Sequence, residues 1–209
     1  MQQHQPLYLA SQSRMRKHLL SLSKIFFIEL PQSADESACD WTLPAAEVVG
    51  AIARSKMDYA TVPTSHTTKC AYVLTADTLC VDTKGKVHGK PANEQEARAM
   101  LALWRLGCTV ITGFCLDKKI NHNDIWLTEE RIEQSVSSTI NMSIPDEWIA
   151  YYFENTPSFH VAGGMAIEEY GCQFVHSING SYSNILGLPL FEVREALSKL
   201  NFFSASLAS

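Results

Sequence analysis

The chain has 209 residues, of which 46% are apolar and 19% are charged, and its formal net charge is −5 at pH 7. This composition predicts a globular protein with a sizeable core and excludes a disordered chain. The acidic balance argues against nucleic-acid binding, because no basic excess is left to neutralise a phosphate backbone, and no apolar run approaches the roughly 18 residues of a membrane span.

The N-terminal segment and the cysteines predict a cytoplasmic protein. The segment MQQHQP shows no basic region followed by an apolar one, so no signal peptide is expected. The cysteines form no C-x-x-C pair and no zinc-binding spacing with histidine, and we expect reduced thiols, most of them buried. The six positions are Cys39, Cys70, Cys80, Cys108, Cys115 and Cys172.

The first predicted elements are a strand and a helix. Residues 7–10 are expected to form a short buried strand, and Ser13 stands in the position of a helix cap. In the helix that follows, Met15, Leu19 and Leu22 recur at i, i+4 and i+7, so we expect them to form its core face.

Strands and helices alternate along the rest of the chain. We expect strands over 25–29, 71–82, 108–116, 125–140 and 172–178, and helices over 44–60, 93–106, 144–154 and 191–200. The run over 71–82 is nearly all apolar, which is typical of a central strand covered on both faces. The stretches 61–69 and 117–126 are interpreted as surface loops. The alternation predicts a single α/β domain over residues 1–209, with a layered mixed sheet and flanking helices.

The densest positive charge lies in residues 11–18, SQSRMRKH. A strand that runs into a helix leaves free backbone N–H groups directed at one spot, and Ser11 and Ser13 add hydroxyl donors. Arg16 adds a forked, permanently charged donor pair that suits phosphate oxygens, whereas Arg14 lies about 200° away around the helix. The pattern predicts a phosphate site. The alternative is a serine-capped helix with a solvated basic face.

Lys56 interrupts an apolar stripe on the helix predicted over 44–60. The stripe consists of Val49, Ile52, Ala53 and Ala60. A lysine in its middle must either extend outward along the stripe or meet an anion. The sequence leaves both outcomes open.

Asp77 is placed by the pattern near the carboxyl end of the strand over 71–82, where open α/β sheets gather their ligand sites. Beside Val73, Leu74 and Ala76 it is expected to be partly buried, and it then needs a cation, a metal ion or hydrogen bonds. This favours a functional carboxylate. The alternative is a structural carboxylate that caps the next turn through Thr78.

Three further features carry little signal alone. Glu36 lies in SADES, and Lys90 lies in HGKP between a permissive Gly89 and a restrictive Pro91. The loop over 180–189, GSYSNILGLP, is either a second binding rim or only a connection to the last helix.

Seven segments occur in a fixed order between residue 7 and about residue 200. They are LASQSRMRKHLL, Glu36 in an Asp-Glu pair, IARSKMD around Lys56, TADTL around Asp77, GKP with Lys90, VITGF, and GSYSNILGLPL. Together they resemble the Maf family of nucleoside triphosphate pyrophosphatases, also called septum formation inhibitor Maf-like proteins. Each segment is weak alone, but seven in order are specific.

The resemblance implies a fold and a reaction. The fold would be similar to that of Maf and inosine triphosphatase-like proteins, with a substrate cleft between two lobes, and it is compatible with a homodimer. The reaction would split a nucleoside triphosphate between its α- and β-phosphates. Asp77 matches the proton acceptor that activates water, and Glu36 with Asp77 would hold Mg²⁺ or Mn²⁺. Ser11, Arg16, Lys56 and Lys90 would clamp the triphosphate.

The sequence also departs from the family. Met15 stands where an arginine bearing on substrate choice is common, Cys108 replaces a histidine, and Val161 replaces a lysine. Glu168 matches the branch that acts on 7-methyl-GTP, whereas Thr78 and GSYSN match the branch that acts on dTTP and UTP. Substrate specificity is therefore expected to depend on Met15, Thr78 and Glu168, with the preferred base open.

Three functions follow from these observations. The first is an active pyrophosphatase on non-canonical or pyrimidine nucleotides, which the residues at the expected phosphate site support. The second is a nucleotide-binding regulator of cell division or septum formation with weakened catalysis, which the three departures favour. The third is a different α/β protein, such as a dinucleotide-binding enzyme. It is disfavoured because no G-x-G-x-x-G or Walker pattern follows a predicted strand.

Overall fold

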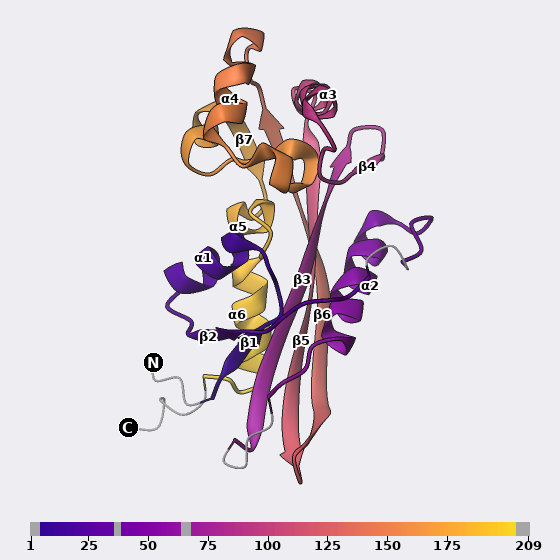
Figure 1. Cartoon of the computed structure of the whole chain (residues 1–209), viewed down its shortest axis with the longest axis vertical. Helices are drawn as coiled ribbons and strands as arrows, with labels where there is room; N and C mark the ends of the chain where they lie inside the picture. Colours follow the sequence, from indigo (N-terminus) through magenta and orange to yellow (C-terminus); the bar gives the residue numbers. More distant parts are fainter. Residues whose placement is uncertain (1–4, 36–38, 64–67, 204–209) are drawn as a thin grey trace.

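The computed structural model describes residues 5–35, 39–63 and 68–203. Its central feature is a seven-stranded mixed sheet in the order β2-β1-β3-β5-β6-β7, with β4 paired to β3 (Figure 1). The strands are β1 (Leu7–Leu9), β2 (Phe27–Glu29), β3 (Cys70–Asp82), β4 (Val87–His88), β5 (Cys108–His122), β6 (Ile125–Met142) and β7 (Val175–Asn179). β1 runs parallel to β2 and β3, and the other pairings are antiparallel. The predicted α/β fold with a layered mixed sheet is confirmed.

Helices cover both faces of the sheet. They are α1 (Arg14–Leu22), α2 (Ala45–Asp58), α3 (Glu94–Trp104), α4 (Ile149–Asn155), α5 (Tyr182–Ile185) and α6 (Leu190–Lys199). Figure 1 shows α1 and α6 on one side of β3 and α2 on the other. Residues of β3 therefore alternate between the two sides: Leu74 packs in the cluster with α1 and α6, whereas Val73 packs in the cluster with α2.

The strand β3 confirms the prediction made from its apolar run. It lies between β1 and β5, and most of its residues from Ala71 to Cys80 are buried. A central strand covered on both faces needs apolar residues at nearly every position, because neither face meets solvent.

The prediction that residues 117–126 form a surface loop is wrong. β5 and β6 continue through this stretch as a hairpin, and only Asn123 and Asp124, with φ of 50° and 67°, form its turn. The charged residues that suggested a loop belong to strands β5 and β6. Asp117 is fully buried because Arg131 on β6 donates to it through Nε (2.7 Å) and Nη2 (2.9 Å).

The first helix confirms its cap but not its whole core face. Ser13 caps α1, and its hydroxyl accepts a hydrogen bond from the Arg16 backbone N–H at 3.3 Å. Leu19 is buried and Met15 partly so, but Leu22 is 62% exposed, so its prediction as a core residue is wrong. The buried stripe runs instead through Arg16, Leu19 and Leu20. The stripe thus begins at Arg16, one residue after the partly buried Met15 that was expected to begin it.

Other expectations need small corrections. The helix predicted over 93–106 is α3, and it begins at a cap in which the Asn93 side chain accepts from the Glu96 N–H at 2.9 Å. The last strand begins at Val175 rather than residue 172, because residues 169–174 form 3₁₀ turns. All six cysteines are free thiols, and three of them, not most, are buried. None of the helices in the described ranges is long and apolar enough to cross a bilayer.

Candidate active site

A gap in the sheet edge defines the site. β1 pairs with β3 up to Leu74, and β4 begins its pairing with β3 at Cys80. Between these points one edge of β3 has no strand neighbour among the described strands, and a cavity of about 1160 Å³ opens there. A cavity of this size accommodates a nucleotide-sized ligand. The site therefore lies where a short parallel strand ends beside a longer one.

Asp77 lies in the middle of β3, not near its carboxyl end as predicted. The strand continues to Asp82 because its later residues pair with β4. The carboxyl end that borders the cavity belongs to β1, where Leu9 faces Leu74. Asp77 nevertheless lines the cavity because it stands just beyond the point where β1 leaves the sheet.

Lys56 meets an anion, which decides between the two outcomes that the sequence left open. Its Nζ donates to Oδ1 of Asp77 at 2.7 Å, and the two side chains are 8% and 13% exposed. Each charge compensates the other's loss of water, so neither side chain has to reach bulk solvent. The pair lies on the α2 side of the sheet.

Two hydrogen bonds tie α2 into this position. The Thr75 hydroxyl, on the same face of β3 as Asp77, donates to the Ala53 carbonyl at 2.6 Å. The Gln32 side-chain amide donates to the carbonyl of Lys56 itself at 3.0 Å. Both contacts lie within one helical turn of Lys56, so they fix where its side chain begins.

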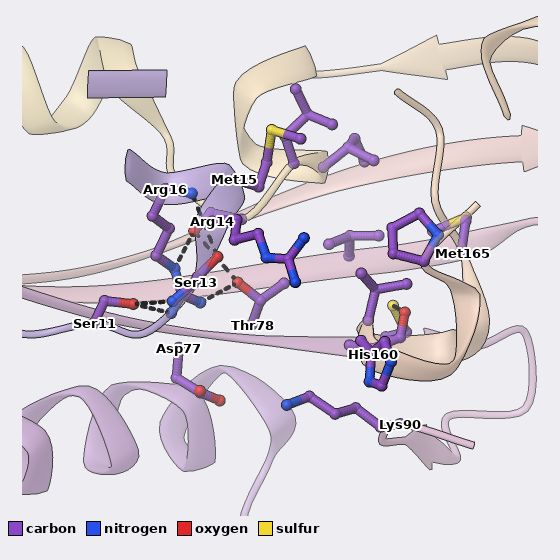
Figure 2. A pocket seen from close by; sticks show the side chains of 18 of the residues that line it. Ser11, Ser13, Arg14, Met15, Arg16, Asp77, Thr78, Lys90, His160 and Met165 are labelled. Carbon is purple, nitrogen blue, oxygen red and sulfur yellow. Dashed lines mark hydrogen bonds between the residues drawn. The ribbon is translucent and has the colours of Figure 1, made fainter. Parts of the chain in front are cut away.

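Arg16 occupies the opposite face of β3 and is 8% exposed. Its Nε donates to the Gly187 carbonyl at 2.7 Å, Nη1 to the Ser11 hydroxyl at 3.2 Å and Nη2 to the Thr78 hydroxyl at 2.9 Å (Figure 2). Arg14 is exposed and lines the same cavity. The solvated basic face considered as an alternative thus applies to Arg14 but not to Arg16.

Ser11 and Ser13 act here as acceptors within the turn. The Ser11 hydroxyl accepts from the Ser13 backbone N–H at 3.3 Å as well as from Arg16. The Ser13 hydroxyl caps α1. Both serines line the cavity, so the predicted serine-and-arginine turn does border the space where a ligand would lie.

Lys90 enters the cavity from a third direction. Its side chain is exposed, and Figure 2 shows its ammonium group pointing toward Asp77. The segment is anchored on both sides: His88 contacts Asp82 at 2.8 Å, and the Gly163 N–H donates to the Gly89 carbonyl at 2.8 Å. The hydrogen bond from His88, with backbone N–H groups of the turn, lowers the pKa of Asp82 to about 2.

The other end of the cavity is mainly apolar. Figure 2 places Met165 and His160 away from Ser11 and Asp77. Met165 packs in one apolar cluster with Val110, Ile167 and Ile185, and Leu186 packs against it. All five line the cavity, as do Met15 and Val161. Glu168 and Tyr182 also line the cavity, and burial together with the Glu168 charge raises the pKa of the Tyr182 phenol. The cavity thus combines a cationic end with an apolar end, and its lining also includes the Glu168 carboxylate.

The comparisons with known proteins identify the family. Residues 6–200 match the family described as Maf-like protein. The chain belongs to the Maf family.

Similar Maf proteins cover nearly all of the chain. A dTTP/UTP pyrophosphatase from Parabacteroides distasonis is 37% identical over 91% of this chain and 94% of its own length. Another from Syntrophus aciditrophicus is 34% identical over 96% of this chain and 92% of its own length. A nucleoside triphosphate pyrophosphatase from Rickettsia rickettsii is 31% identical, covering 97% of this chain and 91% of its own length.

A divalent metal is the cofactor that the Maf family implies. Across the described ranges, no three histidine, cysteine or acidic side chains cluster closely enough to hold a metal ion, and Glu36 lies outside these ranges. Among the described residues that line the cationic end of the cavity, Asp77 supplies the carboxylate. Mg²⁺ commonly binds through one or two carboxylates, waters and substrate phosphates. The residues fit this mode but not a closed cage of protein ligands.

The departures from the Maf pattern fall in two different places. Met15 and Val161 line the cavity, so each removes from its wall a positive charge that the family pattern usually places there. Cys108 does not line it: the thiol is buried in the apolar cluster around Trp104. Only two of the three departures therefore touch the site directly.

Sequence reasoning missed several contributors. The hydrogen-bond network of the Arg16 side chain also includes the Gly187 carbonyl and the buried residues Thr112 and Asn184. Gly187 and Asn184 belong to the loop over 180–189, so this loop is part of the site. The exposed Trp41 and His160 line the cavity as well. For Gly187 the signal was the glycine itself, which has φ of 99°. The others gave no separate signal, because a carbonyl acceptor or a cavity wall leaves no residue pattern.

Proposed function

We propose that this chain is a nucleoside triphosphate pyrophosphatase, a hydrolase that splits dTTP and UTP into the monophosphate and pyrophosphate. The observation that carries the proposal is the Asp77–Lys56 contact of 2.7 Å at the cationic end of the cavity. The names of the relatives at 34% and 37% identity support the same activity.

The phosphate groups would lie among three cations that approach from different elements. Arg16 comes from α1, Lys56 from α2 and Lys90 from the segment after β4. A preorganised set of positive groups stabilises the charge that develops on the leaving pyrophosphate and compensates for the water that its oxygens lose. Three acceptors hold the Arg16 guanidinium in place, so it needs little reorganisation when the substrate enters.

Asp77 would act as the proton acceptor. Water attacks the α-phosphorus, its proton passes to the Asp77 carboxylate, and the bond to the bridging oxygen of the pyrophosphate breaks. Lys56 holds this carboxylate at the cavity wall. Bound Mg²⁺ or Mn²⁺, with Asp77 and Glu36 as protein ligands, would neutralise charge on the phosphate oxygens.

The apolar end would receive the nucleobase. Met15, Thr78 and Glu168 all line the cavity, and the Thr78 hydroxyl is already bonded to Arg16. A carboxylate accepts hydrogen bonds from ring and exocyclic N–H groups, which a guanine edge provides in a pair and a uracil or thymine ring provides singly. Glu168 therefore favours 7-methyl-GTP as the second candidate substrate.

The test is pyrophosphate release from dTTP, UTP, CTP, 7-methyl-GTP and ATP, with Mg²⁺, with Mn²⁺ and with a chelator. We expect turnover of dTTP and UTP that the chelator and Asp77→Asn both abolish. Preference for 7-methyl-GTP would correct the base but keep the reaction. Folded protein that binds these nucleotides without turnover would overturn the enzyme assignment and support a nucleotide-binding regulator, as the apolar Met15 and Val161 in the cavity wall would suggest.

A further inference from the structure

Two adjacent residues of β5 lie directly beside the reactive part of β3. The register pairs Gly113 with Asp77 and Thr112 with Thr78. Successive residues of a strand face opposite sides of the sheet, so Gly113 faces α2 and Thr112 faces α1 and α5. Both belong to the VITGF segment, to which the proposed reaction gives no role. Neither residue lines the cavity.

Gly113 allows the backbone of α2 to rest directly on the sheet. A Cβ atom at this position would lie 2.8 Å from the Val49 carbonyl oxygen and 2.9 Å from the Gly50 nitrogen. Both are backbone atoms of a helix, which cannot rotate away as a side chain could. Any larger residue therefore has to push α2 away from β5. Val49 and Lys56 are seven residues apart, on the same face of α2, so a shift at Val49 is transmitted to Lys56.

Thr112 belongs to a hydrogen-bond chain with a defined direction. Its hydroxyl donates to the Asn184 carbonyl at 3.1 Å, which leaves its oxygen to accept from the Thr78 hydroxyl at 3.0 Å. The Thr78 oxygen is then oriented to accept from Nη2 of Arg16 at 2.9 Å. Because the Asn184 carbonyl can only accept, the Thr112 hydroxyl is the donor in that contact, and the Thr78 hydroxyl has Thr112 and the more distant Gly187 carbonyl (3.5 Å) as acceptors. Thr112 is fully buried, so no water replaces it.

We propose that Thr112 and Gly113 are positioning residues, which set Arg16 on one face of β3 and Lys56 on the other. The inference rests on the proposed pyrophosphatase function, because it assigns these two cations to the substrate phosphates. It explains why a threonine and a glycine stand next to each other in a buried strand: one supplies a hydroxyl to one face and the other supplies space to the opposite face.

The test for Thr112 is a double-mutant cycle. The readouts are kcat/KM for pyrophosphate release and the Kd of the non-hydrolysable α,β-methylene analogue of the same nucleotide. Thr112→Val keeps the shape and removes the hydroxyl, and we expect it to lower kcat/KM about five- to tenfold, as one lost hydrogen bond does. Thr112→Ser restores the hydroxyl and should restore activity. In an Arg16→Met background, Thr112→Val should cause no further loss.

The test for Gly113 is a second double-mutant cycle, in which Lys56 on α2 is the partner residue. Gly113→Ala is expected to lower kcat/KM on the order of 100-fold by displacing Lys56, and to add nothing in a Lys56→Met background. The matched control is Gly50→Ala on the facing helix, whose Cβ would meet Ser135 Oγ at 3.6 Å, an ordinary contact. If Gly113→Ala does not fold, Thr75→Val takes its place, because it removes the hydrogen bond to Ala53 without adding volume.

The outcomes separate this inference from the proposed function. An inactive wild-type protein would refute the proposed function before any variant is compared. An active wild type with full activity in Thr112→Val and Gly113→Ala would overturn the positioning roles alone. Equal losses in the wild-type and the cation-less backgrounds would also overturn them, because a general structural defect does not depend on Arg16 or Lys56.

Discussion

The ammonium group of Lys56 lies 2.7 Å from the carboxylate of Asp77, although the two residues are 21 positions apart and belong to different elements. Lys56 belongs to a helix that packs on the sheet, and Asp77 lies in a stretch of β3 whose edge has no strand neighbour among the described strands. The contact joins the packing of α2 to the chemistry of the cavity. Its consequences can be measured in both stability and activity.

Removing one partner of this pair should destabilise the protein. Lys56→Met leaves the Asp77 carboxylate nearly buried without its cation, and we expect a loss of about 3–5 kcal/mol in the free energy of unfolding. Urea unfolding measures it. The double variant Lys56→Met with Asp77→Asn removes both charges and should recover most of the loss. If the double variant is as unstable as Lys56→Met, the destabilisation comes from packing rather than from an unpaired charge.

Lys90 should affect the substrate and not the fold. Its side chain is exposed and points into the cavity, so Lys90→Met is expected to raise the Kd for nucleotide roughly tenfold by removing one charge-assisted contact. The melting temperature should stay unchanged. Lys86→Met, in the turn before β4 and outside the cavity, is the control. Equal effects of the two variants would show that Lys90 contributes only to general surface charge.

Val161 offers a test in the opposite direction. It lines the cavity, where a lysine in its place would add positive charge to the wall. We expect Val161→Lys to raise kcat/KM about tenfold, and Val161→Leu, which changes only the size, to leave it near the wild-type value. Steady-state kinetics with the preferred nucleotide decides. A decrease with Val161→Lys would mean that this wall contacts the sugar or the base instead.

Asp82 should make stability depend on pH in the acid range. The hydrogen bond from His88 lowers its pKa from the ordinary 3.8 to about 2, so the folded state binds this proton less readily than the unfolded state. The resulting stabilisation is present above about pH 4 and is lost as the pH falls toward 2. Urea unfolding at pH 5, 4, 3 and 2 should show a flatter profile for Asp82→Asn than for the wild type. Parallel profiles would contradict the assignment.

The buried Asp117 should be the most sensitive charge outside the site. It is fully buried and depends on Arg131, whose pKa is raised by the hydrogen bond to Asp117. Arg131→Met should cost about 3–5 kcal/mol, because it strands a buried carboxylate. The matched control is Arg54→Met, which breaks an exposed ion pair with Glu133 and should cost less than about 1 kcal/mol. Similar costs in urea unfolding would argue against this distinction.

The sequence by itself determined the local elements and the family. Ser13 predicted a helix start and residues 71–82 predicted a central strand, because a capping residue and a continuous apolar run are patterns of neighbouring residues. Local rules failed where a distant partner changed the meaning of a residue. Asp117 suggested a loop until Arg131 neutralised it, and Leu22 suggested core although the buried stripe of α1 runs through Arg16, Leu19 and Leu20.

Only the tertiary structure decided which residues act together. Arg16 is held by Thr78 and by the Gly187 carbonyl, which lie 62 and 171 positions away along the chain. Whether a lysine in an apolar stripe extends to solvent or meets an anion depends on what the opposing strand presents, and no local pattern records that. The reason is physical: propensity and periodicity act over one or two turns, whereas the electrostatics of a buried charge depend on whatever the fold places within a few ångströms of it.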